Sequence, residues 1–193
     1  MVLLSIAVGV AADNKARFAP GPAASYPNHQ TLDKITIAAI PYITEDQLHS
    51  AFDKTNPQKY GVLPVLLVID NGTGKALRLD LEAQYIDVDN RKIDATPLDD
   101  VLYVGGSGKA PRMPGTSPNP LPFPHRAKHG PLNTPEISGH AFAAKMLPIG
   151  DSASGFIYFQ TDFHPGSRFY VNGLKDAATG KEYFYFDLPL DQK

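Results

Sequence analysis

Short apolar segments, each about the length of a β-strand, recur along the chain and are separated by turn-forming residues. Residues 34–40 (KITIAAI) are apolar and rich in β-branched side chains, and residues 65–69 (VLLVI) are continuously apolar, as in a central strand of a sandwich. Leu77, Leu79 and Leu81 then alternate with small or charged residues, the period of two of a half-buried strand. The intervening DNGTGK has the Asn-Gly chemistry that favours a hairpin turn.

The same pattern predicts further strands towards the C-terminus. They cover KIDA and DVLYVG (92–95 and 100–105) and the aromatic-rich segments GFIYFQT, SRFYVNG and KEYFYFDL (155–161, 167–173 and 181–188). Turn residues stand between them, at FHPG and KDAATG.

Helix signals are few. Thr44 and Gln47 form a capping box that predicts a helix from about residue 45 to residue 54. Thr134 followed by Pro135 is typical of a second helix start, because proline suits the first helical position. The chain therefore has one or two short helices among seven or eight strands, and it lacks the alternation of strands and helices that a parallel sheet requires.

This pattern predicts a mainly β protein: one antiparallel, immunoglobulin-like β-sandwich domain over residues 32–193. Residues 105–135 interrupt it as an irregular insertion, which holds eight of the 18 prolines and few large apolar side chains. A loop of this length is uncommon in a compact domain unless it is functional or disordered.

The N-terminal segment differs in composition from the rest of the chain. Residues 2–12 (VLLSIAVGVAA) are uncharged and apolar and end in small residues, so we interpret residues 1–12 as a truncated signal segment without its basic leader. A buried N-terminal strand is the alternative. The run is too short to span a bilayer, which predicts no transmembrane span. Residues 13–31 then form an extended leader, and the chain is expected to be secreted or periplasmic.

Composition narrows the function classes. The net charge is −2, and the basic residues are scattered rather than clustered, so no nucleic-acid partner is expected. The chain has no cysteine, which excludes disulfides, thiolate catalysis and cysteine-based metal centres. No cofactor is predicted.

Three stretches carry a resemblance to known proteins. YGVLPVLLVIDNGTGKALRL, LPIGDSASGFIYF and the closing GKEYFYFDLPL resemble a group of secreted bacterial domains with an immunoglobulin-like sandwich. The likeness covers roughly residues 32–104 and 145–190 and leaves out residues 105–135. It implies the fold and export of the chain, and no activity.

Two constellations could suggest an enzyme. Ser152, Asp162 and His164 have the residue types of a hydrolase triad, but the turn around Ser152 is one residue longer than a nucleophile elbow and leads into a strand. That strand should hold Ser152 and His164 at opposite ends, about 20 Å apart. We therefore favour a structural turn.

The histidines are the other constellation. His125 and His129 have a spacing of four residues, which places two imidazoles on one helix face, but flanking prolines leave room for at most one helical turn. His140 is the only further candidate. Solvated loop histidines are the favoured interpretation, and a metal-dependent protein or enzyme that uses these three residues is the alternative.

The aromatic strands give a stronger candidate. Alternation places Ile157, Phe159, Phe169, Val171, Phe184 and Phe186 on a core face and the tyrosines opposite them. If the strands are neighbours, Tyr158, Tyr170, Tyr183 and Tyr185 form an outer row suited to recognition. The other interpretation, which we favour for the tyrosines themselves, is that a helix or the proline-rich loop covers them as a second core layer.

Together these observations favour a non-enzymatic, exported binding or structural module of the cell envelope. Its candidate binding surface is the tyrosine row together with the loop around Phe123. The expected partner is another envelope protein or a glycan.

Overall fold

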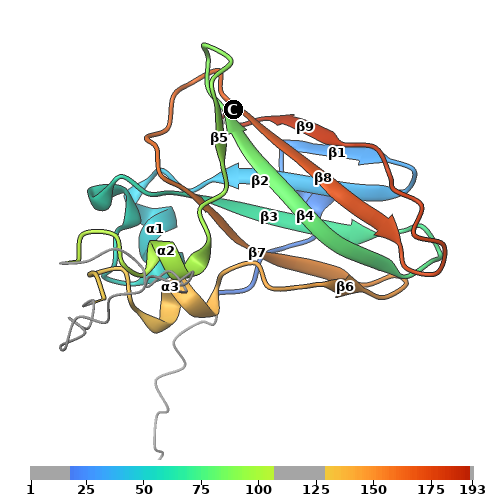
Figure 1. Ribbon diagram of the computed structural model, residues 1–193, viewed down its shortest axis with the longest axis horizontal. Coiled ribbons are helices and arrows are strands. Elements are labelled where there is room, and N and C mark those ends of the chain that lie inside the picture. Colours follow the sequence, from blue (N-terminus) through green and yellow to red (C-terminus); the bar gives the residue numbers. More distant parts are fainter. Residues whose placement is uncertain (1–17, 107–128, 192–193) are drawn as a thin grey trace, which may run out of the picture.

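A computed structural model describes residues 18–106 and 129–191, and these residues form a β-sandwich of two antiparallel sheets (Figure 1). The mainly β fold predicted from the sequence is confirmed; its immunoglobulin-like classification stays a prediction. Sheet A has the order β1 (His29–Leu32), β2 (Ile35–Pro41), β3 (Leu63–Asn71) and β7 (Ser152–Phe159). Sheet B has the order β5 (Lys92–Asp94), β4 (Leu77–Ile86), β8 (Arg168–Asp176) and β9 (Phe186–Pro189), and β6 (Met146–Leu147) pairs with the start of β4.

The chain crosses between the sheets after β3, after β6 and after β7. The turn at residues 70–75 is therefore one of these crossings, and the hairpin expected there from DNGTGK is wrong. The reason lies in Asn71, whose buried side-chain amide binds the carbonyl oxygens of Lys75, Leu147 and Pro148 and so joins the turn to the segment before β7.

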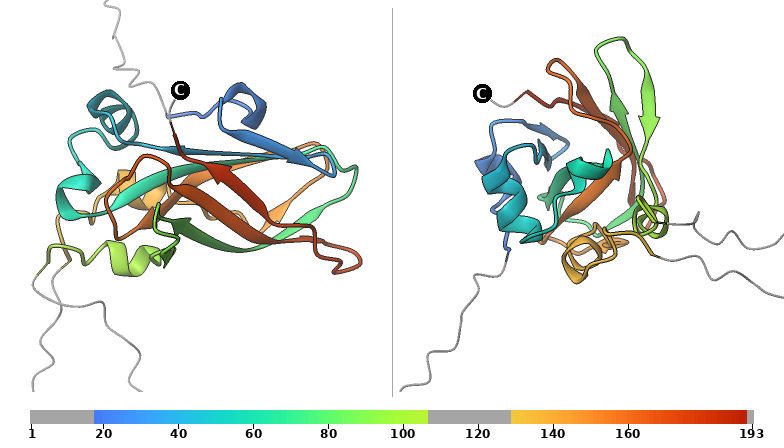
Figure 2. Two further views of the ribbon diagram at one scale, coloured as in Figure 1. Left: turned by 90° about the horizontal axis from the view of Figure 1, so that it is seen from above. Right: turned by 90° about the vertical axis from the view of Figure 1, so that its left-hand side faces the viewer.

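The helices gather at one end of the sandwich (Figure 1). The helix α1 (Glu45–Phe52) has the predicted capping box, since the Gln47 N–H donates to Thr44 Oγ1 at 3.3 Å and the Thr44 N–H donates back to Gln47 Oε1 at 3.1 Å. The predicted start at Thr134 and Pro135 is confirmed as α3 (Pro135–Gly139). The helix α2 (Leu98–Val101) and the 3₁₀ turn η2 (Pro57–Tyr60) lie at the same end, whereas a second 3₁₀ turn, η1 (Ala23–Ser25), lies apart from them against β2 (Figure 2).

The strand expected at residues 100–105 is wrong, because α2 (Leu98–Val101) occupies the start of this segment. Pro97 precedes the helix, and Asp99 and Asp100 lie in its first turn, where acidic side chains favour a helix N-terminus. Val101 is fully buried against the helical layer, so its apolar character reflects helix packing.

Two layers of apolar side chains hold these elements together. The first fills the space between the sheets, and the second lies between sheet A and the helices. Strand β3 contributes to both: Val65 and Leu67 face the sandwich interior, whereas Leu66 and Val68 pack under the helices. This double burial explains why residues 65–69 are continuously apolar.

A β-bulge in sheet B sets which side chains face outward. The pairing of β4 with β8 shifts register between Leu79 and Glu82, opposite Gly173. Gly173 has a φ of +84°, and a Cβ at this position would lie 2.1 Å from the carbonyl oxygen of Asp80. Only glycine fits this conformation and this close approach. The bulge lets Asn172 face outward while Leu174 returns to the core.

Candidate ligand-binding face

The structure separates the residues that resembled a hydrolase triad. Ser152 begins β7, and its hydroxyl donates to Asp70 Oδ1 at 2.6 Å. His164 follows the other end of this strand, with its Nδ1 3.1 Å from Asp87 Oδ1. Each residue therefore has a different carboxylate as partner.

The histidine positions give no shared centre in the described part of the chain. The His129 ring stacks on Tyr103 with centroids 4.6 Å apart, and His140 Nδ1 lies 2.8 Å from the Ala51 carbonyl oxygen. Among residues 18–106 and 129–191, no three metal-ligating side chains form a group that could hold an ion. His125 and Phe123 lie outside the described residues, as do residues 1–12.

Tyr158 does not belong to an outer row, so its place in the predicted surface is wrong. Strand β7 belongs to sheet A, and the face that carries Tyr158 is covered by α1 and α3. The side chain is 2% exposed, its hydroxyl donates to the Ile137 carbonyl oxygen at 2.8 Å, and burial raises the pKa of the phenol. The alternative interpretation, a second core layer, holds for this tyrosine.

The segment before β9 also departs from simple alternation. Tyr183 is partly buried and packs against the core between the sheets, whereas Phe184, expected in the core, is 71% exposed. The regular strand begins only at Phe186, so side chains N-terminal to it do not follow the strand's period of two. The core position of Phe186 is confirmed.

Tyr170 and Tyr185 are the pair that the fold does bring together. Their rings stack with centroids 5.2 Å apart and planes inclined by 29°. Tyr170 is the third residue of β8, its neighbours Phe169 and Val171 lie in the core, and Tyr185 is 55% exposed. The pair forms an aromatic step on the outer face of sheet B, where β4 and β8 lie in front in Figure 1 with no helix over them.

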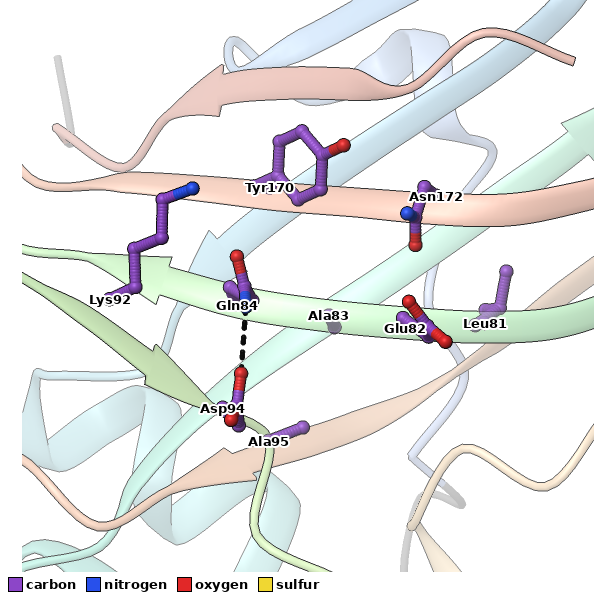
Figure 3. A pocket seen from close by; sticks show the side chains of 9 residues that line it. All are labelled: Leu81, Glu82, Ala83, Gln84, Lys92, Asp94, Ala95, Tyr170 and Asn172. Atoms are coloured by element: carbon purple, nitrogen blue, oxygen red, sulfur yellow. Dashed lines mark hydrogen bonds between the residues drawn. The ribbon is translucent and has the colours of Figure 1, made fainter.

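An open hollow of about 570 Å³ lies beside Tyr170 on this face. Figure 3 shows polar side chains from β4, β5 and β8 around it, with Gln84 Nε2 donating to Asp94 Oδ1 at 2.7 Å. Its lining consists of Leu81, Glu82, Ala83, Gln84, Lys92, Asp94, Ala95, Tyr170 and Asn172. We call this hollow together with the Tyr170–Tyr185 pair the sheet B face.

Strand register aligns the main groups of the sheet B face in one row. Gln84 pairs with Asp94 on one side and with Tyr170 on the other, and Tyr170 pairs with Asp187 of β9. Four neighbouring strands therefore present one outward side chain each, over roughly 14 Å at about 4.8 Å per strand. The row crosses the sheet perpendicular to its strands.

Ion pairs flank this row at both ends of the sheet. Asp80 lies between Arg78 at 3.0 Å and Lys175 at 3.3 Å, and the hydrogen bond from Lys175 lowers the pKa of its carboxyl. Arg168 donates to Asp187 Oδ2 at 2.5 Å. These charges are partnered within the protein, and the hollow between them carries Glu82, Lys92 and Asp94 beside its tyrosine and amide groups.

Two oxygens beside Tyr170 have no protein partner. Among the residues that the structure describes, three buried side-chain polar atoms form no hydrogen bond, and two of them are Asn172 Oδ1 and Asp187 Oδ1. Asn172 is two residues from Tyr170 on β8, and Asp187 is its register partner on β9. Partnerless acceptors are rare in folded proteins and call for an explanation.

Comparison with known proteins assigns this chain to no family. No protein-family model matches the chain, and no curated protein is similar to it at a significant level. In the described ranges, no helix is both long enough and apolar enough to cross a membrane.

Sequence reasoning missed the polar half of the sheet B face. Glu82, Gln84 and Asn172 gave no motif, although the alternation in LRLDLEAQYI already placed Glu82 and Gln84 on the face opposite Leu79 and Leu81. Their pairing with β5 and β8 depends on contacts between distant segments, which a local pattern does not contain.

Proposed function

We propose that this protein is a non-catalytic, exported binding module and that its ligand binds on the sheet B face. The observation that carries the proposal is the stacked pair of Tyr170 and exposed Tyr185 beside an open polar hollow. Tyrosine offers a large amphipathic contact area at low entropic cost, which suits recognition.

Two further observations support this assignment. The apolar run at residues 2–12 and the resemblance to secreted bacterial domains favour an exported protein of the cell envelope or its surroundings. The separate hydrogen bonds of Ser152 and His164 favour a non-catalytic role, because a nucleophile needs its base within hydrogen-bond reach.

The test maps the ligand surface by NMR. Isotope-labelled protein is titrated with envelope material of the source organism, separated into protein, lipid and polysaccharide fractions. At least one fraction should shift amide signals around residues 82–84, 92–95, 170–172 and 185–187. The Tyr170→Ala variant should lose these shifts, whereas Tyr60→Ala, which removes an exposed tyrosine of η2, should keep them.

The proposal fails if no fraction shifts these signals, or if the shifts gather on another surface. It also fails if Tyr170→Ala, still folded by circular dichroism, binds as the wild type does.

A further inference from the structure

We infer that the ligand of the sheet B face is an uncharged polysaccharide chain, which binds across the strands. This inference rests on the proposed function, since it names the ligand class for the same face. Four properties of the face lead to it: its aromatic step, its partnerless acceptors, its charge balance and its open shape.

The aromatic step provides an apolar platform with polar surroundings. A sugar ring has a face of C–H groups and a rim of hydroxyls, so it matches a ring surface bordered by hydrogen-bonding side chains. Tyr170 and Tyr185 supply the ring surface, and Gln84 and Asn172 stand beside Tyr170. A flat apolar ligand would leave these amides without partners, at a cost of about 1–3 kcal/mol each where they become buried.

The partnerless oxygens indicate a ligand rich in hydrogen-bond donors. Asn172 Oδ1 and Asp187 Oδ1 accept no hydrogen bond from the protein, and both flank Tyr170. Gln84 already donates to Asp94, which leaves the Gln84 carbonyl oxygen on the same face. Both oxygens are buried in the unliganded protein, so binding would require these side chains to rotate and bring the acceptors to ligand hydroxyls, each of which carries a donor.

The charge balance of the face argues against a charged ligand. Its outward carboxylates are Asp80, Glu82, Asp94 and Asp187, and its outward cations are Arg78, Lys92, Arg168 and Lys175. The four negative and four positive groups balance, and most are paired with each other. A polyanion such as nucleic acid would need an excess of cations, which this face lacks.

The shape of the face favours a chain over a small molecule. Small-molecule sites enclose most of their ligand, whereas this hollow is open to solvent. The row from Asp94 through Gln84 and Tyr170 to Asp187 runs for roughly 14 Å, the length of a short oligosaccharide.

The test measures retardation of the full chain in native gels that contain one soluble polysaccharide each. The uncharged probes are a glucan, a mannan, a xylan and a galactan, and the charged probes are alginate and heparin. At least one uncharged probe should retard the wild type, and the charged probes should not. Tyr170→Ala should weaken binding at least tenfold and Tyr170→Phe less than threefold, because the phenylalanine ring keeps the stacking surface. Gln84→Ala should weaken it about fivefold, the loss of one hydrogen bond of about 1 kcal/mol.

Tyr60→Ala is the matched control and should bind as the wild type does. If Tyr170→Ala does not fold, Tyr185→Ala replaces it, since that side chain is more than half exposed. Retardation by alginate or heparin alone, or equal retardation of wild type and Tyr170→Ala, overturns the inference.

The NMR map separates the two levels of failure. If the protein or lipid fraction shifts the sheet B face while no uncharged polysaccharide binds, the ligand class is wrong and the binding face stands. If no fraction shifts this face, both proposals fail.

Discussion

Asn71 holds together three segments at one end of the sandwich, and replacing it with aspartate tests this role. The side chain is 2% exposed. Its Nδ2 lies 2.7 Å from the Lys75 carbonyl oxygen, 2.8 Å from that of Pro148 and 3.2 Å from that of Leu147. Its Oδ1 accepts from the N–H and hydroxyl of Thr73. Asn71→Asp keeps the shape and the acceptor but puts a carboxylate oxygen in place of the donor.

The expected loss follows from those distances. The variant removes the donor from the two closest carbonyl oxygens, and a buried acceptor left without a partner costs about 1–3 kcal/mol, so the free energy of unfolding should fall by about 4 kcal/mol at pH 7. The new carboxyl sits among carbonyl oxygens, so its folded pKa should be raised above the unfolded value. A carboxyl with a raised folded-state pKa destabilises the protein least where it is protonated in both states, that is, below its unfolded pKa. The loss in the free energy of unfolding should therefore be smaller at pH 4 than at pH 7.

Urea unfolding followed by circular dichroism at pH 7 and pH 4 measures both effects, with wild type as reference at each pH. Asn133→Asp is the matched control, because it makes the same chemical change at a residue that is exposed on the surface. A loss below about 1 kcal/mol at pH 7, or a loss that does not shrink at pH 4, would show that Asn71 does not hold these segments together.

Three further changes test the fold. Gly173→Ala should lower the free energy of unfolding by at least about 2 kcal/mol in urea titrations, because alanine is strained at this positive φ and meets the Asp80 carbonyl oxygen; an unchanged midpoint would refute the tight bulge. The hydrogen bond from Lys75 lowers the pKa of Asp176 from 3.8 to about 2. The stability that this carboxylate contributes above its unfolded pKa should therefore be lost as the pH falls from about 4 to about 2. Thermal unfolding of Asp176→Asn should not show this pH dependence. Tyr158→Phe should cost about 1–2 kcal/mol in urea and speed hydrogen exchange in α3, because the carbonyl oxygen of Ile137 loses its donor; equal stability would refute that bond.

Local chemistry made several parts of the fold predictable. The capping box at Thr44 and Gln47 predicts α1 because both hydrogen bonds form within four residues. The apolar run at residues 65–69 predicts a central strand because every side chain in it needs burial. Such signals depend on neighbours in the chain, which the sequence displays directly.

The wrong predictions concern features that depend on contacts between segments far apart in the chain. Tyr158 and Tyr170 look equivalent as tyrosines in aromatic strands, and only the assignment of β7 to sheet A and β8 to sheet B separates a buried side chain from an outward one. The turn after β3 has hairpin chemistry, yet contacts of Asn71 with Leu147 and Pro148, far along the chain, direct it across the sandwich. No local pattern contains these choices.

The pairing of β3 with β7 and of β4 with β8 also has a kinetic consequence. Leu66 pairs with Phe156 and Leu79 with Leu174, partners roughly 90 residues apart in the chain. Such contacts require the closure of long loops before they stabilise anything, which places proteins of this kind among the slow folders, at milliseconds to seconds. Until β7 and β8 are synthesised, β3 pairs only with β2, and β4 pairs only with β5 and the short β6. The free edge of the long apolar strand β3 therefore stays open to association with other chains. A chain of this topology therefore gains from being shielded from other chains until β7 and β8 have been synthesised.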